Sequence, residues 1–169
     1  MTDTPAPMAQ AALGHDDKPA DEAFAWSDSF LLGHGPMDAV HQEFVDIVRA
    51  MLTCPDSELL AHLQAFECHA QEHFDQELAW MTSTDFPARE CHDDEHRAVQ
   101  QSVREVIPLV AAGDMALGRR LARALADWFP GHADYLDSAL AQWMVKRASG
   151  GTPVVFKRTL KPSPSPRSG

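Results

Sequence analysis

Histidines and carboxylates recur along this chain at positions where an amphipathic helix would place apolar side chains. His73 and Glu77 are four residues apart, as are His92 and His96, and side chains at i and i+4 lie on one helical face. Burying a polar group without a partner costs roughly a few kcal/mol, and burying an unpaired charge costs more. These pairs therefore predict side chains that meet inside the fold, at a spacing typical of two ligands for one metal ion.

Three further residues extend this set, namely His41 on an earlier apolar stripe and His132 and Asp137 on a later one. Together the candidates provide five imidazoles and two carboxylates. This number exceeds the four ligands that one zinc ion takes. Two octahedral ions accommodate all of them if both carboxylates bridge, and they leave room for a shared solvent ligand and one open position.

Four segments carry apolar residues at three- and four-residue spacing, which predicts amphipathic helices. They run over about residues 36–51, 55–80, 87–112 and 115–147, with Asp114 as the cap of the last. Short connections make neighbouring helices antiparallel, so the expected fold class is all-α, an up-down-up-down antiparallel four-helix bundle. In such a bundle the start of the first helix, the end of the second, the start of the third and the end of the fourth lie together. The candidates of the first three helices occupy these positions. His132 and Asp137 lie deeper, and the fourth helix is long enough to extend past the end of the bundle, which brings them to the same level.

The spacing of His132 and Asp137 does not fit a regular helix. Five residues turn the chain by about 500°, which places the second side chain about 140° away from the face of the first. Two local distortions restore a common face: a bend caused by Pro130-Gly131 just upstream, or a one-residue π-bulge, which often marks a functional site.

The chain resembles the hemerythrin and bacteriohemerythrin family over about residues 24–147. The resemblance rests on Trp26 upstream of MDAVH, on HFDQE followed by WM and FP, on HDDEH, and on the stretch from Trp128 through His132 to Asp137. It implies a cofactor of two non-haem iron ions, bridged by carboxylates and by a hydroxo or oxo group. One iron is implied to be held by His92, His96 and His132, the other by His41 and His73, and the bridges are implied to be Glu77 and Asp137.

The family binds O2 reversibly at the five-coordinate iron, and the resemblance makes this the expected function. The family's O2-pocket positions correspond to Phe74, Val99 and Tyr135. Phe74 matches the family, whereas Val99 stands where a phenylalanine is common and Tyr135 where an aliphatic residue is common. O2 is the expected ligand, with NO and peroxide as alternatives.

Three classes of function use such a site. The leading one is an O2-binding protein for storage or delivery, since no nucleophile triad and no phosphate-binding loop occurs in the sequence. A diiron oxidase or peroxidase is the alternative, and the hydroxyl of Tyr135 near the open iron favours it. The third class is a sensor of O2 or redox state that acts through an unknown protein partner.

The composition restricts partners and location. The chain has 169 residues and a formal charge of −11, which repels nucleic acid and anionic membranes. The sequence has no apolar run long enough to span a membrane and no signal-peptide pattern, and its three cysteines form no CxxC pair. We therefore expect a cytoplasmic protein.

The domain is expected at residues 23–148, between two mobile tails. Residues 1–22 mix Pro, Ala, Asp and Thr without helical spacing, and residues 149–169 are rich in Gly, Pro and Ser. The apolar triplet at residues 154–156 is the one part of the tails with the composition to pack against the bundle.

Overall fold

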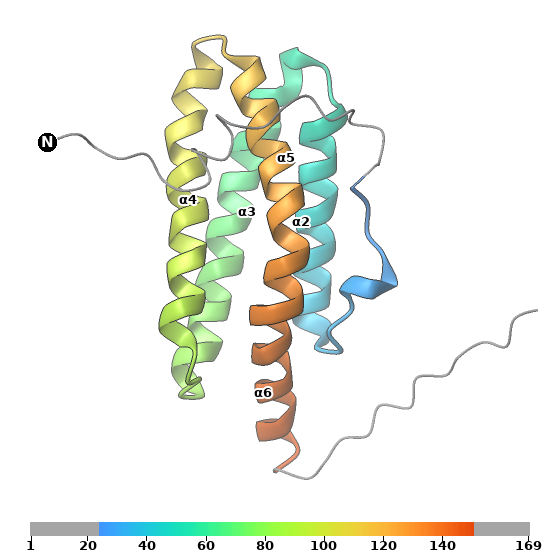
Figure 1. The fold of residues 1–169 in the computed structure, drawn as a ribbon, viewed down its shortest axis with the longest axis vertical. Coiled ribbons are helices and arrows are strands. Elements are labelled where there is room, and N and C mark those ends of the chain that lie inside the picture. The colour runs from blue at the N-terminus through green and yellow to red at the C-terminus, as the bar shows by residue number, and fades with distance from the viewer. Residues whose placement is uncertain (1–23, 151–169) are drawn as a thin grey trace, which may run out of the picture.

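The computed structural model describes residues 24–150, and within them helices joined by short loops are the regular secondary structure (Figure 1). The order is η1 (Asp28–Phe30), α2 (Gly35–Thr53), α3 (Asp56–Ser83), α4 (Arg89–Ala111), α5 (Met115–His132), η2 (Ala133–Asp137) and α6 (Ser138–Ala148). The expected N-terminal tail and residues 151–169 of the C-terminal one, including the triplet at residues 154–156, lie outside the described residues.

The helix boundaries follow local signals in the sequence. Pro36 lies in the first turn of α2, where its missing N–H leaves no hydrogen bond unmade. The side chain of Asp114 accepts a hydrogen bond from the backbone N–H of Leu117 at 2.9 Å and caps α5. Helix α4 continues through Pro108 as far as Ala111, so this proline does not end the helix before its last turn.

The helices form the predicted up-down-up-down bundle. Helix α2 packs against α3 and α5, and α4 packs against the same two helices. The fourth rod of the bundle is continuous from α5 through η2 into α6, and α6 extends beyond the ends of its neighbours (Figure 1). This confirms the all-α four-helix fold.

Two apolar clusters fill the bundle, and the candidate polar residues lie between them. The larger cluster includes Phe44, Phe66 and Val99, and the smaller one includes Met37 and Leu140. Along each of the four rods, the candidates lie between residues of the larger cluster and residues of the smaller one. The polar residues therefore form one layer inside the bundle, with apolar packing on both sides.

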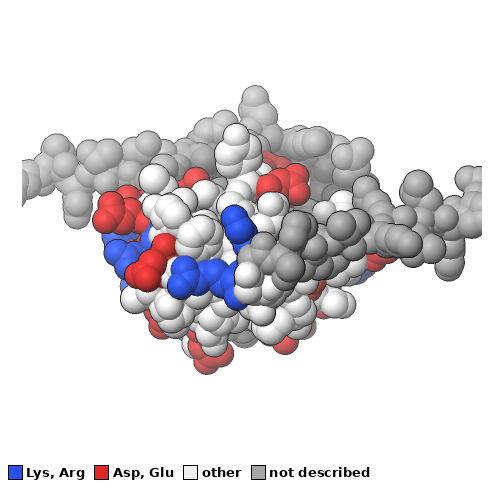
Figure 2. All heavy atoms as spheres, turned by 90° about the horizontal axis from the view of Figure 1, so that it is seen from below, with Lys and Arg blue, Asp and Glu red and all other residues white. Residues whose placement is uncertain are grey.

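The last turn of α6 carries Lys146 and Arg147, where cations interact favourably with the helix dipole. Figure 2 views the molecule from this end and shows basic side chains near the middle of the face with carboxylates around them. Within residues 24–150, no helix combines the length and the apolar character needed to cross a lipid bilayer.

The cap at Asp114 gives a test of how the fourth rod begins. We expect Asp114→Ala to lower the free energy of unfolding by about 1 kcal/mol, because the N–H of Leu117 loses its acceptor. Asp114→Asn should retain most of the stability. Urea unfolding followed by circular dichroism measures both. An equal loss in the two variants would show that the cap hydrogen bond does not stabilise α5.

Candidate metal centre

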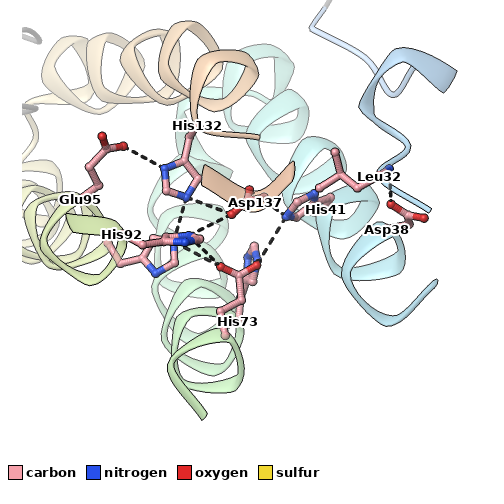
Figure 3. A network of polar contacts seen from close by, with 10 residues as sticks. Leu32, Asp38, His41, His73, His92, Glu95, His132 and Asp137 are labelled. Carbon is pink, nitrogen blue, oxygen red and sulfur yellow. Dashed lines mark hydrogen bonds and ion pairs between the residues drawn. The ribbon is translucent and has the colours of Figure 1, made fainter. Parts of the chain in front are cut away.

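Seven buried polar side chains from all four rods meet in the layer between the two apolar clusters (Figure 3). We call them the polar cluster, and its members are His41 of α2, His73 and Glu77 of α3, His92 and His96 of α4, His132 of α5 and Asp137 of η2. None of the seven is more than 6% exposed. All seven residues singled out from the sequence are thus brought together.

Glu77 lies between two groups of imidazoles and presents one carboxylate oxygen to each. Its Oε1 is 3.0 Å from Nε2 of His73 and 3.8 Å from Nε2 of His41. Its Oε2 is 3.2 Å from Nε2 of His92 and 3.5 Å from Nε2 of His96.

Asp137 repeats this arrangement from the opposite helix. Its Oδ2 is 3.2 Å from Nε2 of His41, whereas its Oδ1 is 3.0 Å from Nε2 of His92 and 3.3 Å from Nε2 of His132. Both carboxylates therefore join the same two groups of nitrogens, as a bridging ligand of two metal ions does.

The ligand atoms fall into two sets, within each of which they lie no more than 4.8 Å apart. The first set consists of Glu77, His92, His96, His132 and Asp137, and the second of His41, His73 and Glu77. Glu77 belongs to both sets. The geometry fits two neighbouring metal ions that share carboxylates better than one ion bound by every residue.

Several buried atoms of the polar cluster have no hydrogen-bond partner among the described residues, and such atoms are candidates for ligands of a cation. Among residues 24–150, no partner in hydrogen-bonding geometry meets five buried atoms: Nε2 of His41, Nε2 of His92, Oε2 of Glu77 and both carboxylate oxygens of Asp137. Buried polar atoms are normally paired. Lone pairs that converge on a shared space, with two carboxylate charges among them, suit metal ions, so the cluster is a metal-binding site.

Burial and the contacts within the polar cluster shift the pKa values of its side chains. Burial alone would lower the pKa of His41 and of His92, but contacts with Asp137 and Glu77 outweigh it and raise both pKa values to about 9. Burial dominates at His96 and lowers its pKa well below the usual value. Burial and the charge of Asp137 act to raise the pKa of Glu77, but contacts with histidines prevail and hold it below its usual range. Without metal, protons on imidazoles balance the buried carboxylates.

A π-helical turn resolves the spacing of His132 and Asp137. Residues Ala133–Asp137 form η2, a π-helix inserted between α5 and α6. In this geometry residues five apart lie on one face, which directs both side chains into the polar cluster. Of the two distortions left open by the sequence, the π-bulge is the one present.

The three expected O2-pocket residues differ in their placement. Phe74 stacks on the ring of His96, with centroids 3.8 Å apart and planes at 7°. Val99 is buried in the larger apolar cluster. Tyr135 does not line an internal pocket, because its side chain is 83% exposed. The expectation for Tyr135 was wrong: the π-turn that directs Asp137 inward leaves Tyr135 on the outer side of the rod.

The sequence interpretation missed two residues in contact with the cluster. The ring of Phe129 lies 5.2 Å from that of His41 in an edge-to-face arrangement, and it stacks on Phe44 at 4.6 Å. Glu95 contacts the outer nitrogen of His132, with Oε2 at 2.9 Å from Nδ1. Phe129 lies three residues before His132, which is the helical signal that could have revealed it.

A four-helix bundle with a buried layer of histidines and carboxylates defines a class of metal-binding bundle proteins. Comparison of sequences identifies the family. Residues 33–144 match the family described as the Hemerythrin HHE cation binding domain. A bacteriohemerythrin from Ralstonia nicotianae is 39% identical over 122 residues, which cover 72% of this chain and 89% of that protein. The chain belongs to the hemerythrin family.

Glu77 contacts both groups of imidazoles, so its charge should decide whether two ions bind. We expect Glu77→Gln to reduce the metal content from two ions per chain to one or none, because the neutral amide cannot bridge two cations. Asp75→Asn is the matched control, since it removes an exposed carboxylate from the same helix. Metal analysis of the purified variants measures the ratio, and two ions in Glu77→Gln would exclude a bridging role.

The raised pKa values of His41 and His92 predict how metal binding depends on pH. Both imidazoles are protonated below about pH 9 in the metal-free protein, and a metal ion must displace these protons. Affinity should therefore increase with pH, by at least roughly tenfold between about pH 6.5 and pH 8. Titration of metal-free protein with Co(II) at both values tests this, and equal affinities would contradict the proposed proton displacement.

Proposed function

We propose that the polar cluster binds two iron ions and that the protein binds O2 reversibly. His92, His96 and His132 are the proposed ligands of one iron, and His41 and His73 those of the other. Glu77 and Asp137 are the proposed bridges. The observation that carries the proposal is that each carboxylate presents one oxygen to each group of nitrogens. The resemblance to a bacteriohemerythrin supports the choice of iron and O2.

Such a pair of iron ions supplies the two electrons that reversible O2 binding requires. The protein supplies a fixed ligand set in surroundings with little access to water. Phe74 and Phe129 border the cluster with aromatic rings and are at most 4% exposed. Apolar walls of this kind limit the access of water and of protons to a bound ligand. We infer a role in O2 storage or delivery, with NO and peroxide as competing ligands.

The position of Tyr135 does not favour an oxidase or peroxidase function. That function depended on the hydroxyl of Tyr135 next to the open iron, and that side chain lies on the surface. Among the described residues, no other tyrosine is available, because Tyr135 is the single tyrosine of the chain.

We further propose that residues 23–148 are the functional unit and that the protein works in the reducing cytoplasm. All residues of the polar cluster lie within this range. Cys54, Cys68 and Cys91 are free thiols, which is typical of a compartment that keeps cysteines reduced.

The absorption spectrum of the anaerobically reduced protein tests this function. We expect a new visible band when O2 is admitted, and we expect the band to disappear when O2 is removed, through repeated cycles. The Asp75→Asn variant should behave identically. If the new band instead disappears irreversibly while water or peroxide forms, this would overturn the carrier function and support an oxidase.

A further inference from the structure

His132 differs from the other four imidazoles of the polar cluster in its outer nitrogen. Its Nδ1 lies 2.9 Å from Oε2 of Glu95 (Figure 3). The Nδ1 atoms of the other four are buried without a hydrogen-bond partner among the described residues, and they belong to His41, His73, His92 and His96. Within the described part of the chain, one proposed ligand imidazole thus has a carboxylate at its outer nitrogen, and the other four have none.

We propose that Glu95 is a positioning residue that orients His132 and strengthens it as a metal ligand. The proposal rests on the metal pair proposed above. An ionised carboxylate only accepts hydrogen bonds, so the proton of neutral His132 resides on Nδ1 and is donated to Glu95. The lone pair of Nε2 then faces the cluster, where this atom lies 3.3 Å from Oδ1 of Asp137 and 2.9 Å from Nε2 of His96.

Trp128 holds this pair in place. Its indole Nε1 donates a hydrogen bond to the same Oε2 of Glu95 at 3.3 Å. Its ring also packs on the imidazole of His132, with centroids 4.3 Å apart and planes at 31°. Glu95 comes from α4, whereas Trp128 and His132 come from α5, so the contact joins two helices beside the metal layer.

The contact lies at the boundary between the polar cluster and solvent. Glu95 has a side chain that is 49% exposed, and it lines an open pocket of about 340 Å³ together with Trp128, Gly131, His132, Tyr135 and Leu136. The outer edge of His132 therefore borders this open pocket, although its side chain is only 2% exposed.

This arrangement makes the two metal positions unequal. A carboxylate that accepts the outer proton of a ligating imidazole increases its basicity, and loss of such partners typically costs about 10–100-fold in metal affinity. Within residues 24–150, the position served by His92, His96 and His132 is the one with this support. Glu95 should therefore strengthen one binding step and not the other.

Stepwise Co(II) titration of the metal-free full chain tests the proposal. Glu95→Ala should weaken one of two binding steps by about 10–100-fold and leave the other unchanged. Glu95→Gln, which keeps an acceptor without the charge, should recover part of the loss. The matched control is Asp94→Asn, which removes the neighbouring carboxylate; this group is 73% exposed and accepts a hydrogen bond from Arg97. Circular dichroism checks that each variant keeps its helix content.

A second measurement reports on the hydrogen bond between His132 and Glu95 and not on metal affinity. In the zinc-loaded protein, ¹⁵N-resolved NMR should show a strongly deshielded Nδ1 proton on His132, and this signal should be shifted or absent in Glu95→Ala. Asp94→Asn should leave it unchanged.

The outcomes separate this inference from the proposed function. If Glu95→Ala changes neither step, or weakens both equally, or if Asp94→Asn has the same effect, the positioning role of Glu95 is wrong even where O2 binding is reversible. Two metal ions with the expected Glu95 effect, but without reversible O2 binding, would support the positioning role and overturn the O2 function. A chain that binds no metal pair would overturn both.

Discussion

Two carboxylates, Glu77 and Asp137, are buried close together in the middle of an apolar bundle, and the surrounding structure is arranged to balance their charge. Removing an ion from water is unfavourable by several kcal/mol unless charge and hydrogen bonds compensate for it. Five imidazoles from four rods provide this compensation, either with protons or by sharing metal ions with the carboxylates. The same contacts connect all four rods of the bundle, so the site and the fold constrain each other.

The bundle maintains this polar layer by packing apolar side chains on both sides of it. The larger cluster, with Phe44 and Phe129, excludes water from one side, and the smaller one, with Met37 and Leu140, closes the end from which α6 continues. A cation that binds the folded layer and not the unfolded chain also stabilises the fold. Glu95 adds an asymmetry, because it supports a single imidazole from the solvent side.

The sequence predicts those features that depend on regular helical periodicity. The pairs His73–Glu77 and His92–His96 are visible because i and i+4 share a face, and the four helices follow from their apolar stripes. The turn around Asp137 was ambiguous, because a π-bulge depends on contacts with other helices that local sequence does not encode. Tyr135 was placed in the O2 pocket from the family's pattern and not from helical periodicity, and the π-turn instead leaves its side chain 83% exposed. The contact of Glu95 with His132 joins α4 to α5, and no local pattern reveals it.

The most direct test of the account is anomalous X-ray diffraction from crystals of the iron-loaded protein, measured above and below the iron absorption edge. Two bridged iron ions should give two anomalous maxima, one among Nε2 of His92, His96 and His132 and the other beside Nε2 of His41 and His73, with an oxygen of each carboxylate directed at each. A single maximum, or maxima outside the polar cluster, would contradict this arrangement.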